Sequence, residues 1–274
     1  MNAILAFITK AFDLILYPFS TLAPVFGVAF MSFLTALFVL WVYSRVSNQT
    51  AIKRLRKRIQ AYFLGIYLFR NDLSLIIESM LRIFSNTFLY IGHSLRPLAV
   101  VIIPIALVCV QMQLRYGHSN LKPGDRVMTA AGLTPQRWDL AGGVTLHASD
   151  GLSLDSPPLT ISSLREIDWD VMINRPGKQS LTFAVNGTVV RKDLYVGNRI
   201  HRTYPATRKA SFWNALVYPG GETIDTHSPF QYVMIHYPSA RIGFLGLHLH
   251  WSIVYFLLAI IFGLLLKRFF GVEF

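Results

Sequence analysis

The sequence predicts an α+β membrane protein with three transmembrane helices, a cytosolic helical hairpin and an extracytoplasmic β-sandwich of the immunoglobulin-like type. Three observations support this fold class. Residues 22–43, 97–113 and 249–266 are apolar segments close to the length that crosses a bilayer as a helix, which satisfies its own backbone hydrogen bonds in lipid. Residues 45–96 are basic and have helical periodicity. Residues 116–247 contain short segments rich in Val, Ile, Thr and aromatic residues.

Composition and charge placement predict the topology. Apolar residues make up 53% of the chain and charged residues 15%, which is on the membrane side of the soluble average. Residues 45–96 hold nine Lys and Arg against two acids, whereas residues 118–247 hold thirteen against ten. Cytosolic loops carry an excess of positive charge, so we expect 45–96 in the cytosol, together with the chain end after Lys267 and Arg268. The amino terminus and the β domain are then outside, and we expect the bacterial inner membrane.

The order of these parts along the chain follows from the same patterns. We expect an interfacial amphipathic helix at 1–20, a first span at 21–44, the cytosolic hairpin at 45–96, a second span at 97–115, the extracytoplasmic β domain at 116–247, and the third span with a short cytosolic tail at 248–274.

The first twenty residues predict a helix that lies flat in the outer interface. Asn2, Thr9, Asp13 and Ser20 are seven, four and seven residues apart, which places them on one stripe of a helix surrounded by apolar residues. The alternative is a frayed hydrophobic leader. Lys10 and Asp13 interrupt the apolar run and no small-residue cleavage site follows, so we expect the segment to stay in the mature protein.

Residues 45–96 predict an antiparallel hairpin of two helices. Apolar residues recur every three or four positions on both sides of Arg70, Asn71 and Asp72, which are turn and N-cap formers. A basic patch lies near its start and consists of Arg45, Lys53, Arg54, Arg56, Lys57 and Arg58. The patch is explained either as a topology signal that binds anionic headgroups or as a contact with a ribosome or nascent chain.

The second and third spans are short. At about 1.5 Å per residue, 97–113 extends roughly 25 Å, less than the roughly 30 Å of the hydrocarbon core. Either the bilayer thins or flanking side chains reach out to water. No span holds an internal acid, so the sequence offers no residues for a proton or ion relay. The predicted interfacial residues are Lys10, Arg115, His248, His250 and Trp251.

The outer block predicts about seven strands. Asn186-Gly187 between two β-rich runs is a strong hairpin signal. Residues 198–221 are expected to be an irregular basic loop that is either solvated or in contact with headgroups or a partner. The predicted strands are 127–130, 143–148, 159–162, 167–173, 180–185, 188–195 and 232–237, and together they suggest an immunoglobulin-like antiparallel sandwich.

No residue pattern points to an enzyme. The five histidines of the outer block are dispersed, and no spacing resembles a zinc or nucleophile-and-base motif. Asp168 and Asp170 share one strand face, where a solvated surface is a better explanation than a calcium site. Cys109 is the one cysteine, so no intramolecular disulfide can form. We therefore expect no catalytic residues, no metal and no cofactor.

The order of elements in residues 1–115 and in the last span resembles the YidC/Oxa insertase superfamily, in particular its minimal three-span members. The resemblance rests on that order and on the proline-containing second span, with Val101-Ile102-Ile103-Pro104 at its centre. Similar proteins are the archaeal YidC-like proteins and the homologous subunits of the ER membrane complex and the Get pathway. The resemblance implies an insertase: a three-helix bundle with a hydrophilic groove, open to cytosol and lipid, beside a thinned bilayer.

Chemistry selects the residues that would line such a groove: Ser32, Thr35, Gln111, Gln113, Ser252 and Tyr255. Small polar residues in spans also join helices to one another, which is the alternative role. Two departures from the family pattern matter. Many bacterial insertases have an Arg within the first span of the bundle, whereas this chain has only Ser44 and Arg45 at the cytosolic edge of that span. Minimal members of the superfamily also lack the outer β domain that this chain has.

Two functions are consistent with this organisation. The first is an insertase or membrane chaperone for nascent membrane proteins. The second is a non-catalytic anchoring or assembly subunit that presents a partner-binding sandwich outside. The expected partners are membrane lipids, nascent membrane proteins or the ribosome, and other membrane-complex subunits that bind the β domain; no DNA is expected.

Overall fold

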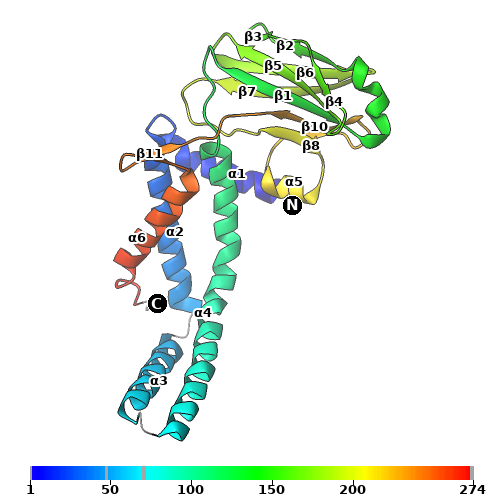
Figure 1. The fold of residues 1–274 in the computed structure, drawn as a ribbon. Helices are drawn as coiled ribbons and strands as arrows, with labels where there is room; N and C mark the ends of the chain where they lie inside the picture. Colours follow the sequence, from blue (N-terminus) through cyan, green and yellow to red (C-terminus); the bar gives the residue numbers. More distant parts are fainter. Residues whose placement is uncertain (1, 47–48, 70–71, 272–274) are drawn as a thin grey trace. The chain divides into compact units, whose positions relative to one another are not determined.

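The computed structural model describes residues 2–46, 49–69 and 72–271, and its fold is α+β (Figure 1). The chain forms two compact units. One consists of Met1–Val28 and Cys109–Trp251 and contains the β-sheets; the other consists of Ala29–Val108 and Ser252–Phe274 and is helical. We call them the β unit and the helical unit.

Apolar helices dominate the helical unit. Helix α2 (Pro24–Val46) and the Pro97–Tyr116 part of helix α4 are each long and apolar enough to cross a membrane. Helix α6 (Trp251–Leu266) is equally apolar but shorter, with 16 residues. The predicted third span is thus a helix below the usual spanning length.

Helix α4 (Leu73–Tyr116) joins two elements that the sequence analysis treats as separate. It continues for 44 residues through Pro97 and Pro104, without a break between the second arm of the hairpin and the second apolar segment. Each proline removes one backbone donor and crowds the carbonyl four residues before it, but its fixed φ is compatible with a helix, so the helix continues at some cost in stability. The helix therefore has no break at the predicted membrane boundary between residues 96 and 97.

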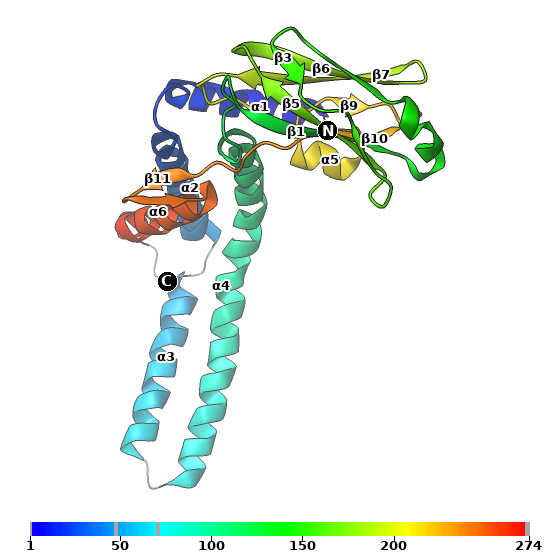
Figure 2. The ribbon, with the colours of Figure 1, turned by 45° about the horizontal axis from the view of Figure 1, so that its top comes forward.

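The structure has two helices at the predicted hairpin, one on each side of the predicted turn. Helix α3 (Gln49–Leu68) lies beside the first half of α4 in Figures 1 and 2. Asp72 is the N-cap: its Oδ1 accepts hydrogen bonds from the backbone N–H groups of Ser74 at 3.0 Å and Leu75 at 3.2 Å. Arg70 and Asn71 of the predicted turn lie outside the described residues.

The β unit begins with helix α1 (Asn2–Leu16) and the short helix η1 (Tyr17–Phe19), and it contains two main sheets. The larger sheet has the strand order β3-β5-β1-β10-β8-β9, with β4 also paired to β5, and the smaller has the order β2-β6-β7. A separate hairpin is formed by β11 (Ile242–Phe244) and β12 (Leu247–Leu249). The other bounds are β1 (Arg126–Leu133), η2 (Pro135–Gly143), β2 (Thr145–Ala148), β3 (Leu152–Leu154), β4 (Leu159–Ile161), β5 (Glu166–Ile173), β6 (Gly177–Val185), β7 (Thr188–Val196), β8 (Ala206–Lys209), α5 (Phe212–Val217), β9 (Thr223–Ile224) and β10 (Phe230–Ile235).

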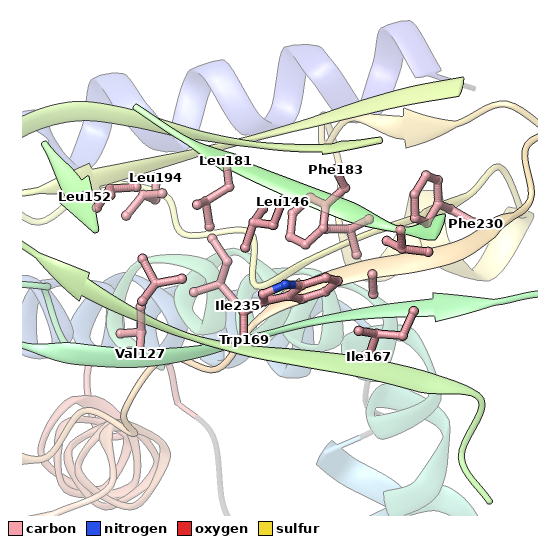
Figure 3. Close-up of a cluster of buried hydrophobic side chains, with 14 of the residues drawn as sticks. Val127, Leu146, Leu152, Ile167, Trp169, Leu181, Phe183, Leu194, Phe230 and Ile235 are labelled. Atoms are coloured by element: carbon pink, nitrogen blue, oxygen red, sulfur yellow. The ribbon is translucent and has the colours of Figure 1, made fainter. Parts of the chain in front are cut away.

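The two main sheets share one apolar core (Figure 3). Leu181 and Phe183 of the smaller sheet are buried in it with Val127, Trp169 and Ile235 of the larger sheet. Trp169 and Phe183 meet edge to face, with ring centroids 5.7 Å apart. Alternate residues of each strand enter this core, as expected of strands with one buried face.

All seven predicted strands are confirmed, within a few residues, as β1, β2, β4, β5, β6, β7 and β10. The Asn186-Gly187 turn is also confirmed: Val185 pairs with Thr188, and both turn residues have positive φ, 46° and 77°. Two expectations need correction. The strands are not all antiparallel, because β8 pairs with β9 in parallel. Residues 198–221 are not wholly irregular, because they contain β8 and α5. These elements are too short to show a periodicity.

Candidate functional site

Three of the predicted groove residues lie between α2 and α6. The Ser32 hydroxyl donates to the Tyr255 carbonyl oxygen at 3.0 Å, and the Tyr255 hydroxyl donates to Thr35 Oγ1 at 2.9 Å. All three residues are buried, whereas Ser252 at the start of α6 is half-buried. Their polar groups bind the two helices together, which is the alternative role that the sequence allowed.

A hollow of about 360 Å³ adjoins this contact within the helical unit. Its lining is almost wholly apolar and comes from α2, α6 and Ile105 of α4. Thr35 and Tyr255 are its polar members, and they bond to each other. Ile260 and Leu264 line it and are exposed. The hollow therefore differs from the predicted hydrophilic groove, since hydroxyls in an apolar setting bond within the protein to avoid the cost of an unpaired polar group.

Gln111 and Gln113 belong to the β unit, with different partners. Gln111 Nε2 donates to Thr9 Oγ1 of α1 at 3.0 Å. Gln113 Oε1 accepts from the indole Nε1 of Trp251 at 2.8 Å. Four of the predicted groove residues thus belong to the helical unit and two to the β unit, and at least five of the six have a polar partner within their own unit.

Arg115 is the centre of a buried polar cluster. One guanidinium nitrogen donates to the carbonyl oxygen and to Oε1 of Gln111, at 2.8 and 2.9 Å. The other donates to Asp13 Oδ1 at 2.5 Å and to the Thr9 carbonyl oxygen at 3.3 Å. Asp13 also pairs with Arg202 at 3.2 Å, so α1, the end of α4 and the segment before β8 meet here.

The predicted interfacial residues differ in exposure. Arg115 is only 6% exposed, and Trp251 is also buried. Asp13 supplies a negative charge inside the protein, so the Arg115 guanidinium is compensated without extending to water. Lys10 and His248 are exposed, and His250 is half-buried beside Trp251, with ring centroids 5.6 Å apart.

Helix α1 has two distinct faces. Thr9 and Asp13 of the predicted polar stripe point to Gln111 and Arg115, so the stripe is an internal contact. The opposite face holds Phe7, Leu14 and Tyr17 of the following η1, which are 73%, 79% and 72% exposed, with Lys10 among them. The side chain of Asn2, also predicted on the stripe, lies outside the described residues. The apolar face of this amphipathic helix is thus not covered by the part of the chain that the structure describes.

The helical hairpin exposes both charge and apolar surface. Arg45 and the five basic residues 53, 54, 56, 57 and 58 are exposed, and Leu55 among them is buried. Most of the apolar residues expected to pack between the arms are exposed as well. The exposed members of the two predicted stripes are Phe63, Phe69, Leu73, Ile77, Met80, Phe84, Phe88 and Ile91. Outside those stripes, Leu64, Tyr67, Leu68, Leu81 and Leu89 are also exposed. Two helices can cover only a narrow stripe of one another, and the apolar surface of each arm is wider than that stripe.

A polar cavity of about 600 Å³ lies in the β unit, lined by β6, β7, the segment before β8 and residues of η1. Its most unusual member is Lys192, which is 3% exposed and donates from Nζ to Thr207 Oγ1 at 3.0 Å. Burial lowers the pKa of this amine to about 8, against the attraction of Glu222 and Asp193. The sequence analysis overlooked Lys192, although its place among the inward positions 190, 194 and 196 of β7 was a signal.

The carboxylates on β5 are less solvated than predicted. Glu166 and Asp168 are both buried, and burial raises the pKa of each carboxyl. Asp168 Oδ1 has no hydrogen-bond partner, whereas Asp170 faces Arg126 at 3.7 Å. Neighbouring side chains such as Tyr232 and His236 lie close to the pair. Within the described ranges, no three His, Cys, Asp or Glu side chains come together as a metal site.

Comparisons with known proteins identify no relative: no protein-family model, no curated protein and no solved structure matches the chain significantly.

Proposed function

We propose that the chain is a membrane-protein insertase or membrane chaperone of the YidC/Oxa type. Its three spans are α2, the Pro97–Tyr116 part of α4, and α6. The α3/α4 hairpin lies in the cytosol of a bacterium, and the β unit lies outside the inner membrane as an immunoglobulin-like sandwich. Two helices long and apolar enough to cross a membrane support the membrane location.

The observation that carries this proposal is the exposed apolar surface of the hairpin. Tyr67, Met80, Phe84 and Phe88 are each more than half exposed, and they belong to a larger apolar set on both arms. A soluble surface rarely leaves so much contiguous apolar area in water, because its burial is worth roughly 25 cal/mol per Å². Such a surface binds an apolar partner, and an emerging transmembrane segment is one.

The apolar hollow offers a second contact on the path into lipid. Its exposed members Ile260 and Leu264 can pack against a transmembrane segment of a client. Helix α6, with 16 residues, extends about 24 Å at 1.5 Å per residue, which is short of a bilayer core of about 30 Å. A locally thinned bilayer lowers the cost of moving a polar client segment across, and it does so without a polar groove.

Site-specific crosslinking to a stalled membrane-protein nascent chain tests the proposal. A photoreactive residue at position 84 in the hairpin or position 264 at the hollow should form adducts with the nascent chain. The same residue at position 189, on the exposed surface of β7, is the matched control and should form none. Adducts that are no stronger at 84 and 264 than at 189 contradict an insertase.

The alternative is an anchoring or assembly subunit that presents the β unit to partner subunits. The Ser32, Thr35 and Tyr255 hydrogen bonds favour it, because they join α2 and α6 and leave few polar groups for a client. The same crosslinking experiment separates the two functions. Adducts at 84 and 264 with stable membrane subunits, and none with nascent chains, identify the anchor.

A further inference from the structure

Helix α5 exposes an aromatic surface that the β unit does not cover. Phe212 and Trp213 are 56% and 69% exposed, and Leu216 and Val217 are exposed as well. The two aromatic rings meet edge to face, with centroids 5.4 Å apart. Trp and Phe with flanking basic residues are typical of protein segments at the level of lipid headgroups.

Hydrogen bonds tie the chain before α5 to the ends of both long apolar helices. The Thr203 N–H donates to the Leu114 carbonyl oxygen, in the last turns of α4, at 2.7 Å. The Ile200 N–H donates to the carbonyl oxygen of Ser20, four residues before α2, at 3.0 Å. Helix α5 begins nine residues after Thr203, so its start lies within roughly 30 Å of this hydrogen bond.

The same end of the β unit packs closely. A Cβ at Gly27, in the first turn of α2, would collide with the hydroxyl of Tyr116 at the end of α4. The side chains of Arg202 and Asp13 pair at 3.2 Å and attach the segment before β8 to α1. The position of α5 therefore follows from contacts that surround the proposed membrane surface.

Helices α1 and α5 are neighbours. Leu5 and Ala6 of α1 and Asn214 and Ala215 of α5 line one hollow of about 270 Å³. Figure 1 shows the two helices next to each other, below strand β8. Each of them leaves large apolar side chains exposed, and the exposed cations Lys10 and Arg208 accompany them.

We infer that α5 is a second membrane anchor, which inserts Phe212, Trp213, Leu216 and Val217 into the outer leaflet beside the apolar face of α1. The occupant of this surface is the bilayer, since the two helices offer apolar and aromatic side chains flanked by cations, the combination that suits an interface with anionic lipid. The β unit is then held on the membrane at two places. This inference rests on the membrane topology of the proposed function and does not require insertase activity.

Depth-dependent fluorescence quenching tests the inference on the full-length protein. Single cysteines replace Leu216 in α5 and Leu14 in α1 in a Cys109→Ser background, and each carries an environment-sensitive fluorophore. The protein is reconstituted in nanodiscs of phosphatidylcholine and phosphatidylglycerol, with or without lipids that carry a quencher in the acyl chain. We expect blue-shifted emission and several-fold stronger quenching at 216 and 14 than at the control Val189→Cys on β7.

A further label, Ile103→Cys in the apolar part of α4, separates two kinds of failure. Quenching at 103 with none at 216 overturns the α5 anchor and leaves the membrane function intact. No quenching at 103 either contradicts the membrane location itself. A blue shift at 216 without lipid quenching means that protein covers α5, which also overturns the inference. Far-UV circular dichroism of each labelled variant shows whether it has kept its fold.

Discussion

At the scale of single residues, Arg115 shows how a charge is accommodated near the end of an apolar helix. Its side chain is almost closed to solvent, and it meets Asp13 and oxygens of Thr9 and Gln111. A buried charge is tolerated when it is paired and hydrogen-bonded. The same contacts hold the polar side of α1 inward, and the apolar side of α1 is left outward as a result.

Replacing Asp13 by Asn should weaken this cluster. Arg115 and Arg202 would lose their carboxylate while the amide keeps the volume, and we expect a loss of about 1 to 3 kcal/mol of stability, because a buried cation is left poorly compensated. Thermal unfolding of the protein in detergent measures the effect. Lys10→Gln is the matched control, as Lys10 is exposed on the other side of α1. An Asp13→Asn melting temperature equal to that of the control would show that the ion pair contributes nothing.

Lys192 should make stability depend on pH. Its pKa is about 8 in the folded protein and near the ordinary 10.5 in the unfolded chain. Between these values the unfolded chain binds more protons, so the free energy of unfolding contributed by Lys192 increases as the pH rises through this window. Each pKa unit corresponds to about 1.4 kcal/mol. The free energy of unfolding should therefore rise by roughly 3 kcal/mol in total between the two pKa values of Lys192.

Unfolding curves of the wild type and of Lys192→Met at a series of pH values from 7 to 11 test this effect. Tyrosines titrate in the same range in both proteins, so the difference between the two curves isolates Lys192. We expect the wild type to gain stability relative to Lys192→Met as the pH rises. A difference that stays constant with pH would mean that the amine has an ordinary pKa.

At the scale of elements, α2 and α6 are joined by polar contacts in an apolar surrounding. Ser32, Thr35 and Tyr255 provide two hydrogen bonds between these helices, next to an apolar hollow. Apolar side chains in lipid gain little by meeting one another, so such contacts specify which helices pair. The polar residues that suggested a groove therefore act in assembly of the helical unit.

Tyr255→Phe tests the contribution of one of these bonds. The change removes the hydroxyl that donates to Thr35, and we expect a loss of about 0.6 kcal/mol, the usual value for an interhelix hydrogen bond in a membrane protein. Comparison of thermal unfolding in detergent with that of the exposed α6 variant Ile253→Leu measures it. If the double variant Thr35→Val with Tyr255→Phe regains the lost stability, the unpaired Thr35 hydroxyl is the cause of the loss. Equal melting temperatures for all variants would exclude this hydrogen bond as a stabilising contact.

At the scale of the whole molecule, charge placement predicts which parts face the cytosol. The α3/α4 hairpin carries most of the exposed basic patch, whereas the β unit carries fifteen Lys and Arg against eleven Asp and Glu. Translocation of a segment with many positive charges is disfavoured, so we expect the hairpin to stay on the cytosolic side. The proposed anchor in α5 and the proposed client surface in the hairpin then belong to opposite sides of the membrane.

Cysteine labelling in spheroplasts tests that topology. Val189→Cys on β7 and Tyr67→Cys on α3 are both exposed positions, each made in the Cys109→Ser background. We expect a membrane-impermeant maleimide to label position 189 in intact spheroplasts and position 67 only after lysis. The opposite pattern would invert the topology and exclude a cytosolic client surface on the hairpin.

Local patterns predicted most of the strands and the hairpin. Alternation of β-formers along residues 180–195, with Asn186-Gly187 between them, depends on neighbours in sequence, and β6 and β7 follow it closely. The apolar periodicity on both sides of Asp72, which predicted the two helices of the hairpin, also depends on residues close in sequence. The short strands β8 and β9 and the helix α5 were missed because their partners, and not their own sequences, define them.

The candidate sites were less predictable, because each depends on residues far apart in the chain. The sequence indicated that Gln111, Thr35 and Tyr255 are polar groups in apolar segments, yet it did not indicate that each has a partner within the protein. It also did not show that the hairpin leaves apolar residues such as Phe84 exposed, since burial depends on how closely two arms pack.

The sequence by itself determined the apolar segments, the basic patch, the strand positions and the amphipathic character of α1, because each is set by residue type and spacing along the chain. The tertiary structure alone decided which face of α1 is internal. Asp13 and Arg115 are 102 positions apart, and their pairing turns the polar stripe inward and leaves Phe7 and Leu14 outward. Charge pairing over such a distance depends on the whole fold, which brings the two ends of the β unit together.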